Sequence, residues 1–305
     1  MEKHFDVAAL GEAMVEFNQT HPGKPHYLQG FGGDTSNAVI AAARAGAKTA
    51  YLTRLGQDMF GDALMDLWQQ EGVDTSGVER ELKAPTGIYF VSHGPNGHEF
   101  NYLRTDSAAS RMTPQWLPRA LIANSRILHV SGVSLAISPT ARETVFEAMI
   151  HAREAGTLVS LDSNLRLKLW SLEEARAGIT QAIGLCDLFL PSVDDVAVLS
   201  GREDPDDIVD WSHSLGAKKV VLKLGAEGAL VSDGSRRERL AGHRVQVLDA
   251  TGAGDCFCGN LLARMALGDT VFGAARYANA AAAIAVQGFG AVAPLPWPEQ
   301  VKALL

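Results

Sequence analysis

Short apolar runs alternate with longer amphipathic or alanine-rich segments along most of the chain. The apolar runs predict strands at residues 7–10, 49–52, 127–130, 158–161, 188–190 and 220–224. The longer segments predict helices at residues 36–45, 60–71, 141–155 and 172–182. This alternation is typical of βαβ units around a mainly parallel sheet, which indicates an α/β protein. Because ligands bind beyond the carboxyl ends of such strands, residues that follow each strand are the first candidates for a site.

Residues 87–104 break the alternation. Two apolar runs flank the sequence Gly94-Pro95-Asn96-Gly97, which is a strong turn signal. The pattern predicts an antiparallel hairpin. A hairpin does not fit easily into a parallel sheet, so we expect it to project as a flap. The alternative is an edge hairpin without any role in a site.

Length and composition indicate one globular domain, residues 1–305, with ample apolar material for a large core. Apolar residues make up 47% of the chain, and the formal net charge is −8. A broad negative field repels nucleic acid and anionic membranes, so we expect neither as a partner. We find no signal-peptide pattern and no apolar run of about 18 residues, so we expect a soluble, cytoplasmic protein. The three cysteines give no disulfide framework and are expected to be reduced core thiols.

The most informative stretch is Asp249-Ala-Thr-Gly-Ala-Gly-Asp255, which precedes an apolar helix. The small residues Gly252, Ala253 and Gly254 let backbone N–H groups surround an anion, and the helix N-terminus adds partial positive charge. Asp255 lies at the same helix start and can accept a proton from an attacking hydroxyl during phosphoryl transfer. The alternative is that Asp255 only caps the helix, as aspartate often does.

A second glycine-rich stretch, residues 30–37, leads into another predicted helix. Its glycines, Gly33 among them, allow a ligand to approach the backbone, and Asp34 and Asn37 offer groups that hydrogen-bond hydroxyls. The alternative is an ordinary glycine loop. Two other nucleotide motifs fail: the P-loop pattern is absent, and residues 288–293, which fit the dinucleotide pattern, follow a helix and are followed by prolines.

The two glycine-rich stretches, in this order, resemble the ribokinase-type (PfkB) carbohydrate kinase family over essentially the whole chain. The first reads Gly-Gly-x-x-x-Asn and the second Asp-x-Thr-Gly-Ala-Gly-Asp. The resemblance implies a ribokinase-like three-layer α/β/α sandwich, with a mainly parallel central sheet and a small lid of inserted strands around residues 12–30 and 86–105. It also implies ATP as phosphate donor, Asp255 as the catalytic base, and Gly252, Ala253 and Gly254 as an anion hole.

The resemblance also suggests a nucleotide site, formed by Asn164, Ser192, Lys223, Gly225, Gly228 and Asn279. One departure concerns Mg²⁺. The family often carries Asn-x-x-Glu near the phosphates, and this chain has Ser192-Val-Asp-Asp195 instead. The shorter Asp195 is expected to contact Mg²⁺ through water. Some members bind K⁺, and residues 288–293 resemble part of that site, which leaves K⁺ open as a further cofactor.

The acceptor is expected to be an acid because arginines and tyrosines fall at predicted ligand-facing positions. Strand alternation places Tyr102 and Arg104 on one face of the hairpin, with Tyr89 on the opposite strand. Arg166 follows a predicted strand, and a guanidinium can hold a carboxylate through two parallel hydrogen bonds. The alternative is that both arginines are solvated or paired with surface acids.

Within the family, these residues most resemble the branch that phosphorylates the terminal hydroxyl of 2-keto-3-deoxygluconate. Its acid would be held by Tyr89, Tyr102, Arg104 and Arg166, and its polyol part by Gly33, Asp34 and Asn37. A fructokinase or ribokinase acting on a neutral sugar stays open, as does a sugar sensor without catalysis. The hairpin has one apolar face, which leaves a homodimer through the lid open as well.

Overall fold

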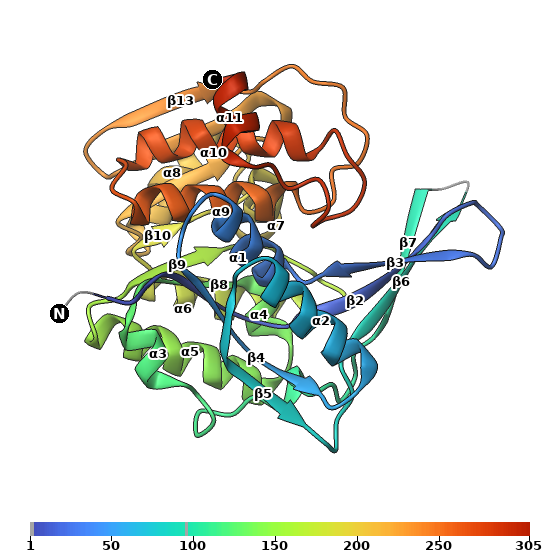
Figure 1. Ribbon diagram of the computed structural model, residues 1–305. Coiled ribbons are helices and arrows are strands. Elements are labelled where there is room, and N and C mark those ends of the chain that lie inside the picture. Colours follow the sequence, from blue (N-terminus) through green and yellow to red (C-terminus); the bar gives the residue numbers. More distant parts are fainter. Residues whose placement is uncertain (1–2, 95–96) are drawn as a thin grey trace.

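The computed structural model describes residues 3–94 and 97–305, and its strands form two separate sheets (Figure 1). The larger sheet has the strand order β13-β12-β11-β10-β9-β8-β1-β4-β5. Its strands are β1 (Phe5–Leu10), β4 (Thr49–Gly56), β5 (Asp74–Glu81), β8 (Ser125–Ser131), β9 (Leu158–Asp162), β10 (Leu188–Phe189), β11 (Lys219–Lys223), β12 (Gly228–Ser232) and β13 (Arg237–Ala241).

The larger sheet is parallel except at one end, where β12 and β13 pair in antiparallel fashion. Each strand predicted from an apolar run is present, with ends that differ by a few residues. Strands β5, β12 and β13 were not predicted. Strands β5 and β13 form the two edges of the sheet, and their mostly polar sequences carry no apolar run that would predict a strand. The mainly parallel sheet inferred from the sequence is confirmed.

Helices cover both faces of the larger sheet. One face packs on α1 (Asp34–Arg44), α2 (Met59–Gln70), α9 (Ala253–Ala266) and α10 (Val271–Ala285). The other packs on α4 (Gly132–Ala136), α5 (Pro139–Glu154), α6 (Leu172–Leu185), α7 (Val193–Ser200) and α8 (Pro205–Ser214). The short helices α3 (Arg119–Ala123) and α11 (Pro298–Leu304) and the 3₁₀ turns Ala109–Arg111 and Gly225–Glu227 complete the described elements. The expected three-layer α/β/α sandwich is thus confirmed.

The smaller sheet projects to one side of this sandwich (Figure 1). Its strand order is β3-β2-β6-β7, with β2 (Met14–Gln19), β3 (Tyr27–Gly32), β6 (Ile88–Gly94) and β7 (Gly97–Leu103). The expected hairpin is present as the antiparallel pair β6–β7, and Pro95 and Asn96 of its turn lie outside the described residues. Strand β2 pairs with β6 in parallel, so two hairpins from distant parts of the chain share one sheet.

Three further features concern the described residues only. No helix among them is long and apolar enough to cross a membrane. Cys186, Cys256 and Cys258 are buried and free, as expected for core thiols. No group of three or more metal-ligating side chains is found in residues 3–94 and 97–305.

Candidate active site

A cavity of about 850 Å³ lies at the carboxyl ends of β9 and β11, between the starts of α1 and α9 and the smaller sheet. This is the edge of the sheet where the sequence places ligands. Most of the candidate residues line it: Gly33, Asp34, Asn37, Tyr89, Tyr102, Arg104, Asn164, Arg166, Ser192, Asp195, Lys223, Gly225, Gly252, Ala253, Gly254 and Asp255. The structure therefore brings together residues that are more than 200 positions apart in the sequence.

The start of α9 faces this cavity. The Ala253 N–H donates to the Ala250 carbonyl oxygen over 3.2 Å, whereas the N–H groups of Gly254 and Asp255 have no hydrogen-bond partner among the described residues. Gly252 is the N-cap residue and has a φ of 73°, and no side chain in the described part of the chain caps the helix. A Cβ at this position would lie 2.9 Å from the Ala291 side chain, so only glycine fits without a shift. The first-turn N–H groups of an uncapped helix need an outside acceptor, and an anion supplies one.

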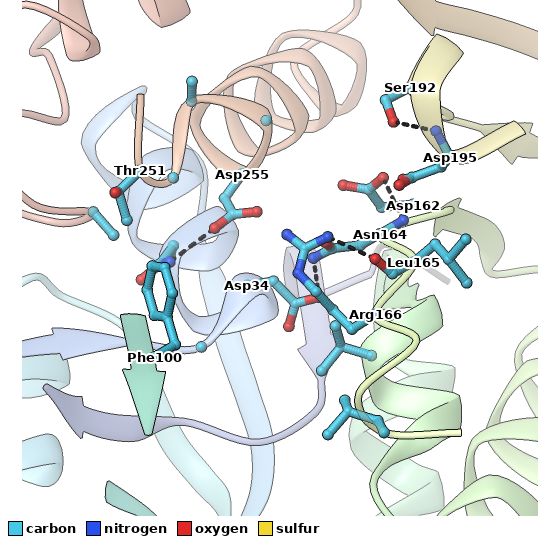
Figure 2. A pocket seen from close by; sticks show the side chains of 18 of the residues that line it. Asp34, Phe100, Asp162, Asn164, Leu165, Arg166, Ser192, Asp195, Thr251 and Asp255 are labelled. Carbon is cyan, nitrogen blue, oxygen red and sulfur yellow. Dashed lines mark hydrogen bonds between the residues drawn. The ribbon is translucent and has the colours of Figure 1, made fainter. Parts of the chain in front are cut away.

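Asp255 lies in the first turn of α9 and points toward α1 (Figure 2). Its Oδ2 accepts a hydrogen bond of 2.8 Å from Nδ2 of Asn37. Burial and the nearby charge of Asp34 together raise the pKa of Asp255 to about 7, although the Asn37 hydrogen bond opposes the rise. The carboxyl group is not the cap of α9, so the simple capping alternative does not describe it. A carboxyl with a pKa near neutrality can accept a proton and release it again.

A buried ion pair lies behind the start of α9. Nζ of Lys223, at the end of β11, lies 2.8 Å from both carboxylate oxygens of Asp162, at the end of β9. Sγ of Cys258 on α9 lies 3.4 Å from Oδ2 of Asp162. A Cβ on Gly254 would lie 3.5 Å from the Lys223 ammonium, which places this positive charge close to the glycines. Burial lowers the pKa of Lys223, but the charge and hydrogen bond of Asp162, together with the electrostatic contributions of Cys258 and Asp195, raise it overall, so the ammonium stays charged.

Two separate groups of hydrogen bonds position polar side chains that line the cavity (Figure 2). Nδ2 of Asn164 donates to Oδ2 of Asp34 over 2.7 Å. Asn164 has a φ of 23°, a conformation that asparagine tolerates better than most residues. Nearby, Oγ of Ser163 donates to Oδ2 of Asp195 over 2.7 Å, and Oγ of Ser192 accepts from the Asp195 backbone N–H. These bonds hold both carboxylates in fixed positions.

The smaller sheet contributes an aromatic wall. Tyr89 and Tyr102 are directly opposite on β6 and β7, with ring centroids 5.6 Å apart, and Phe100 stacks beside Tyr102. The Tyr89 hydroxyl donates to Oε2 of Glu16 over 2.7 Å, so it already has a partner.

Two arginines border this wall. Burial raises the pKa of Tyr102, and the positive charges of Arg166 and Arg104, which line the same cavity, oppose that rise. Arg166 is exposed, donates to the Leu165 carbonyl oxygen and forms no ion pair with any described residue (Figure 2). Arg104 is mostly buried and forms an ion pair with Glu12.

Two expected nucleotide residues do not line this cavity. Gly228 is buried at the start of β12, where its φ of 100° and the nearby Leu240 carbonyl oxygen require glycine. Asn279 on α10 donates to the Ala241 carbonyl oxygen over 2.7 Å. Conversely, sequence reasoning missed Glu12 and Asp162, which both line the cavity. Asp162 is the last residue of β9, and Glu12 lies two residues beyond the end of β1. Their position at the carboxyl ends of strands could have predicted both from the sequence.

Comparisons with known proteins agree with this geometry. The family described as pfkB family carbohydrate kinase matches residues 4–298. A 2-dehydro-3-deoxygluconokinase from Thermoproteus tenax is 34% identical, covering 100% of this chain and 95% of the relative. 2-Dehydro-3-deoxygluconate is another name for 2-keto-3-deoxygluconate. A protein from Arabidopsis thaliana named probable fructokinase-7 is 33% identical, covering 98% of this chain and 92% of the relative.

A solved structure supports the same fold. A candidate ribokinase II from E. coli, in complex with ATP and Mg²⁺, superposes with a TM-score of 0.90 and 25% identity. The match covers 98% of each chain. The ribokinase-like architecture expected from the sequence is therefore confirmed.

Proposed function

The chain belongs to the pfkB family of carbohydrate kinases, and on that premise we propose that it transfers phosphate from ATP to the terminal hydroxyl of a sugar acid. The acceptor proposed is 2-keto-3-deoxygluconate, and the product is 2-keto-3-deoxy-6-phosphogluconate. The observation that carries this choice is Arg166, a cavity-lining guanidinium without an acidic partner among the described residues. A carboxylate supplies the missing partner through two parallel hydrogen bonds.

In this proposal Asp255 is the general base. Its carboxylate accepts the proton of the terminal hydroxyl while the hydroxyl oxygen forms a bond to the γ-phosphorus of ATP and the bond to the β-phosphate oxygen breaks. Gly252, Ala253 and Gly254 form the anion hole of this proposal, since their small side chains give the transferred phosphoryl group access to the unbonded N–H groups at the start of α9. The Lys223 ammonium behind them adds a fixed positive charge.

The residues present fit a nucleotide and Mg²⁺. The uncapped start of α9 and the Lys223 ammonium suit phosphate groups, and Asp195 and Ser192 face the same cavity. We propose that Asp195 holds Mg²⁺ through water, because its carboxylate is short and already accepts a hydrogen bond from Ser163. Bound Mg²⁺ neutralises phosphate charge. We propose that Gly228 and Asn279 shape the nucleotide site from outside the cavity lining. We also propose a K⁺ site at residues 288–293.

A fructokinase is the second candidate. The Arabidopsis relative supports it, and so does the Glu12–Arg104 ion pair, which leaves one of the two expected acid-binding arginines already neutralised. A neutral sugar would use the hydroxyl-binding groups of Asp34 and Asn37 without needing either arginine.

The two candidates are separated by steady-state kinetics with Arg166→Lys. We expect the wild type to have a higher kcat/KM for 2-keto-3-deoxygluconate than for fructose or ribose. Arg166→Lys keeps the charge but loses the two-pronged geometry, so it should raise KM for the acid roughly tenfold and change KM for neutral sugars little. Arg126→Lys, at a half-exposed arginine paired with Asp6 outside the cavity, is the matched control.

Two results would overturn parts of this proposal. A wild type that prefers fructose or ribose refutes the acid kinase and supports the second candidate. A preference for the acid that is unchanged in Arg166→Lys keeps the substrate but removes Arg166 from its binding.

The proposal also covers the location of the reaction, the lid and the dimer. We propose that the reaction takes place in the cytoplasm, where ATP is supplied. The smaller sheet is proposed to act as a lid within a single domain of residues 1–305. It is also proposed to be the contact between two copies of the chain, because its edge strand β3 exposes Tyr27 and Leu28.

A further inference from the structure

Glu12 occupies the joint between the two sheets. It lies in the connection from β1 to β2, and its side chain is 1% exposed. Its Oε1 accepts from Oγ of Ser107 over 2.6 Å, and its other oxygen is paired with Arg104. A Cβ on Gly87 would lie 2.8 Å from Oε1, and one on Gly33 would lie 2.4 Å from the Glu12 carbonyl oxygen. Glu12 thus touches all four places where the chain passes between the sandwich and the smaller sheet.

A carboxylate in such surroundings needs a cation. Burying an ionised carboxylate without a partner costs several kcal/mol, and one hydrogen bond from a neutral serine does not offset this. Arg104, with a side chain that is 11% exposed, supplies the only positive charge paired with Glu12 in the described part of the chain. The two side chains therefore form a pair with no net charge.

The same pair faces the ligand. Glu12 and Arg104 both line the cavity, and so do Tyr102 and Arg166. A guanidinium has five N–H donors, so Arg104 can hold Glu12 on one side and offer further donors to a ligand on the other. An acid that binds there has to share the cation with Glu12. Arg166 has no such competitor among residues 3–94 and 97–305.

We propose that Glu12 is the resident counter-ion of Arg104 and thereby sets how tightly and how selectively the cavity holds an acid. This inference rests on the proposed function and deepens it. Arg166 supplies the net attraction for the substrate carboxylate, whereas Arg104 supplies hydrogen bonds whose charge Glu12 cancels. Glu12 is a specificity-determining residue that acts through Arg104.

Glu12→Gln isolates the charge. The amide keeps the shape, its oxygen can accept from Arg104, and its nitrogen can donate to the Ser107 hydroxyl. With the counter-charge gone, the substrate carboxylate becomes the partner of Arg104. We expect KM for 2-keto-3-deoxygluconate to fall roughly tenfold, because a like charge next to the carboxylate site has been removed. KM for fructose should stay within about twofold.

Glu71→Gln is the matched control. Glu71 pairs with Arg44 over 2.7 Å, with side chains 13% and 10% exposed, and neither residue lines the cavity. Its loss should lower the unfolding temperature much as Glu12→Gln does, without changing either KM. A Glu12→Gln variant whose KM rises for the acid, or changes equally for acid and fructose, would overturn the counter-ion role in favour of a structural one.

Ligand-induced thermal shifts separate this inference from the proposed function. With 2-keto-3-deoxygluconate and no ATP, the unfolding temperature of Glu12→Gln should rise more than that of the wild type, whether or not the acid is phosphorylated. Equal shifts overturn the Glu12 proposal. A larger shift in the variant together with a wild type that phosphorylates only fructose supports Glu12 as counter-ion and refutes the acid kinase.

Discussion

At the residue scale, the raised pKa of Asp255, the proposed general base, predicts a reaction rate that depends on pH in the neutral range. With its pKa at about 7, Asp255 is protonated and unable to accept a proton at lower pH. We expect kcat/KM to fall about tenfold per pH unit below pH 7. Asp255→Asn should lower kcat by roughly 10²–10⁴ and abolish this pH dependence. An Asn variant that keeps more than a tenth of wild-type kcat, with chemistry rate-limiting, would remove Asp255 from the reaction.

The same residue ties activity to stability. An unfolded aspartate titrates near pH 4, so the folded chain binds the Asp255 proton more tightly. Stability contributed by that proton is lost as pH rises from about 4 to about 7. Asp255→Asn avoids the loss, so it should be more resistant to urea than the wild type at pH 8. At pH 5 the difference should be smaller, and equal differences at both pH values would contradict the raised pKa.

Single residues also mark the limit of sequence reasoning. The glycines before Asp255 predict an anion site from their spacing alone, because exposed backbone N–H groups do not depend on any distant side chain. The partners of charged side chains do not follow from spacing. Arg104 reads as an acid-binding residue in the sequence, yet the fold places it beside the buried Glu12, 92 positions earlier (104 − 12). Such a pairing depends on three-dimensional packing.

At the scale of elements, strands and helices with strong apolar patterns follow from the sequence. The predicted start of α1 differs by two residues, since Asp34 and Thr35 already belong to the helix. Strand β13 was missed because the edge sequence Arg-Glu-Arg-Leu-Ala has one buried position. Polar edge strands obtain their structure from backbone pairing with a neighbour, which periodicity does not report.

The smaller sheet should respond to substrate. It projects from the sandwich, and Tyr102 and Leu103 on its edge strand β7 are exposed. Closing such an element excludes water that would otherwise accept the phosphoryl group. We expect amide hydrogen exchange across residues 88–94 and 97–104 to slow with the acceptor and a non-hydrolysable nucleotide. The buried β8 serves as internal reference. Exchange in the smaller sheet that is unchanged at saturation would contradict a moving lid.

At the scale of the whole molecule, the expected homodimer is the contact left to test. The apolar face of the hairpin, which suggested the dimer, is partly covered within one chain, because Phe90 packs on Phe17 and Phe17 packs on Phe60 of α2. The exposed leucines of this sheet lie at its two edge strands, Leu28 on β3 and Leu103 on β7, which are 68% and 63% exposed. Light scattering should give about twice the chain mass of 32.5 kDa, and Leu28→Lys should give the monomer mass. A monomeric wild type would refute the dimer.

The parallel pairing of β2 with β6 also has a consequence for folding. Glu16 and Tyr89, which are hydrogen-bonded across this pair, are 73 positions apart, and α1, β4, α2 and β5 lie between them. Closing so long a loop costs conformational entropy, which is offset only by contacts that form later. We therefore expect β2 and β6 to pair after the intervening unit β4-α2-β5 has packed onto the larger sheet. On the ribosome, the hairpin β2–β3 is made first and waits with an open edge until β6 emerges. During that interval it is the part of the growing chain most exposed to pairing with the wrong strand.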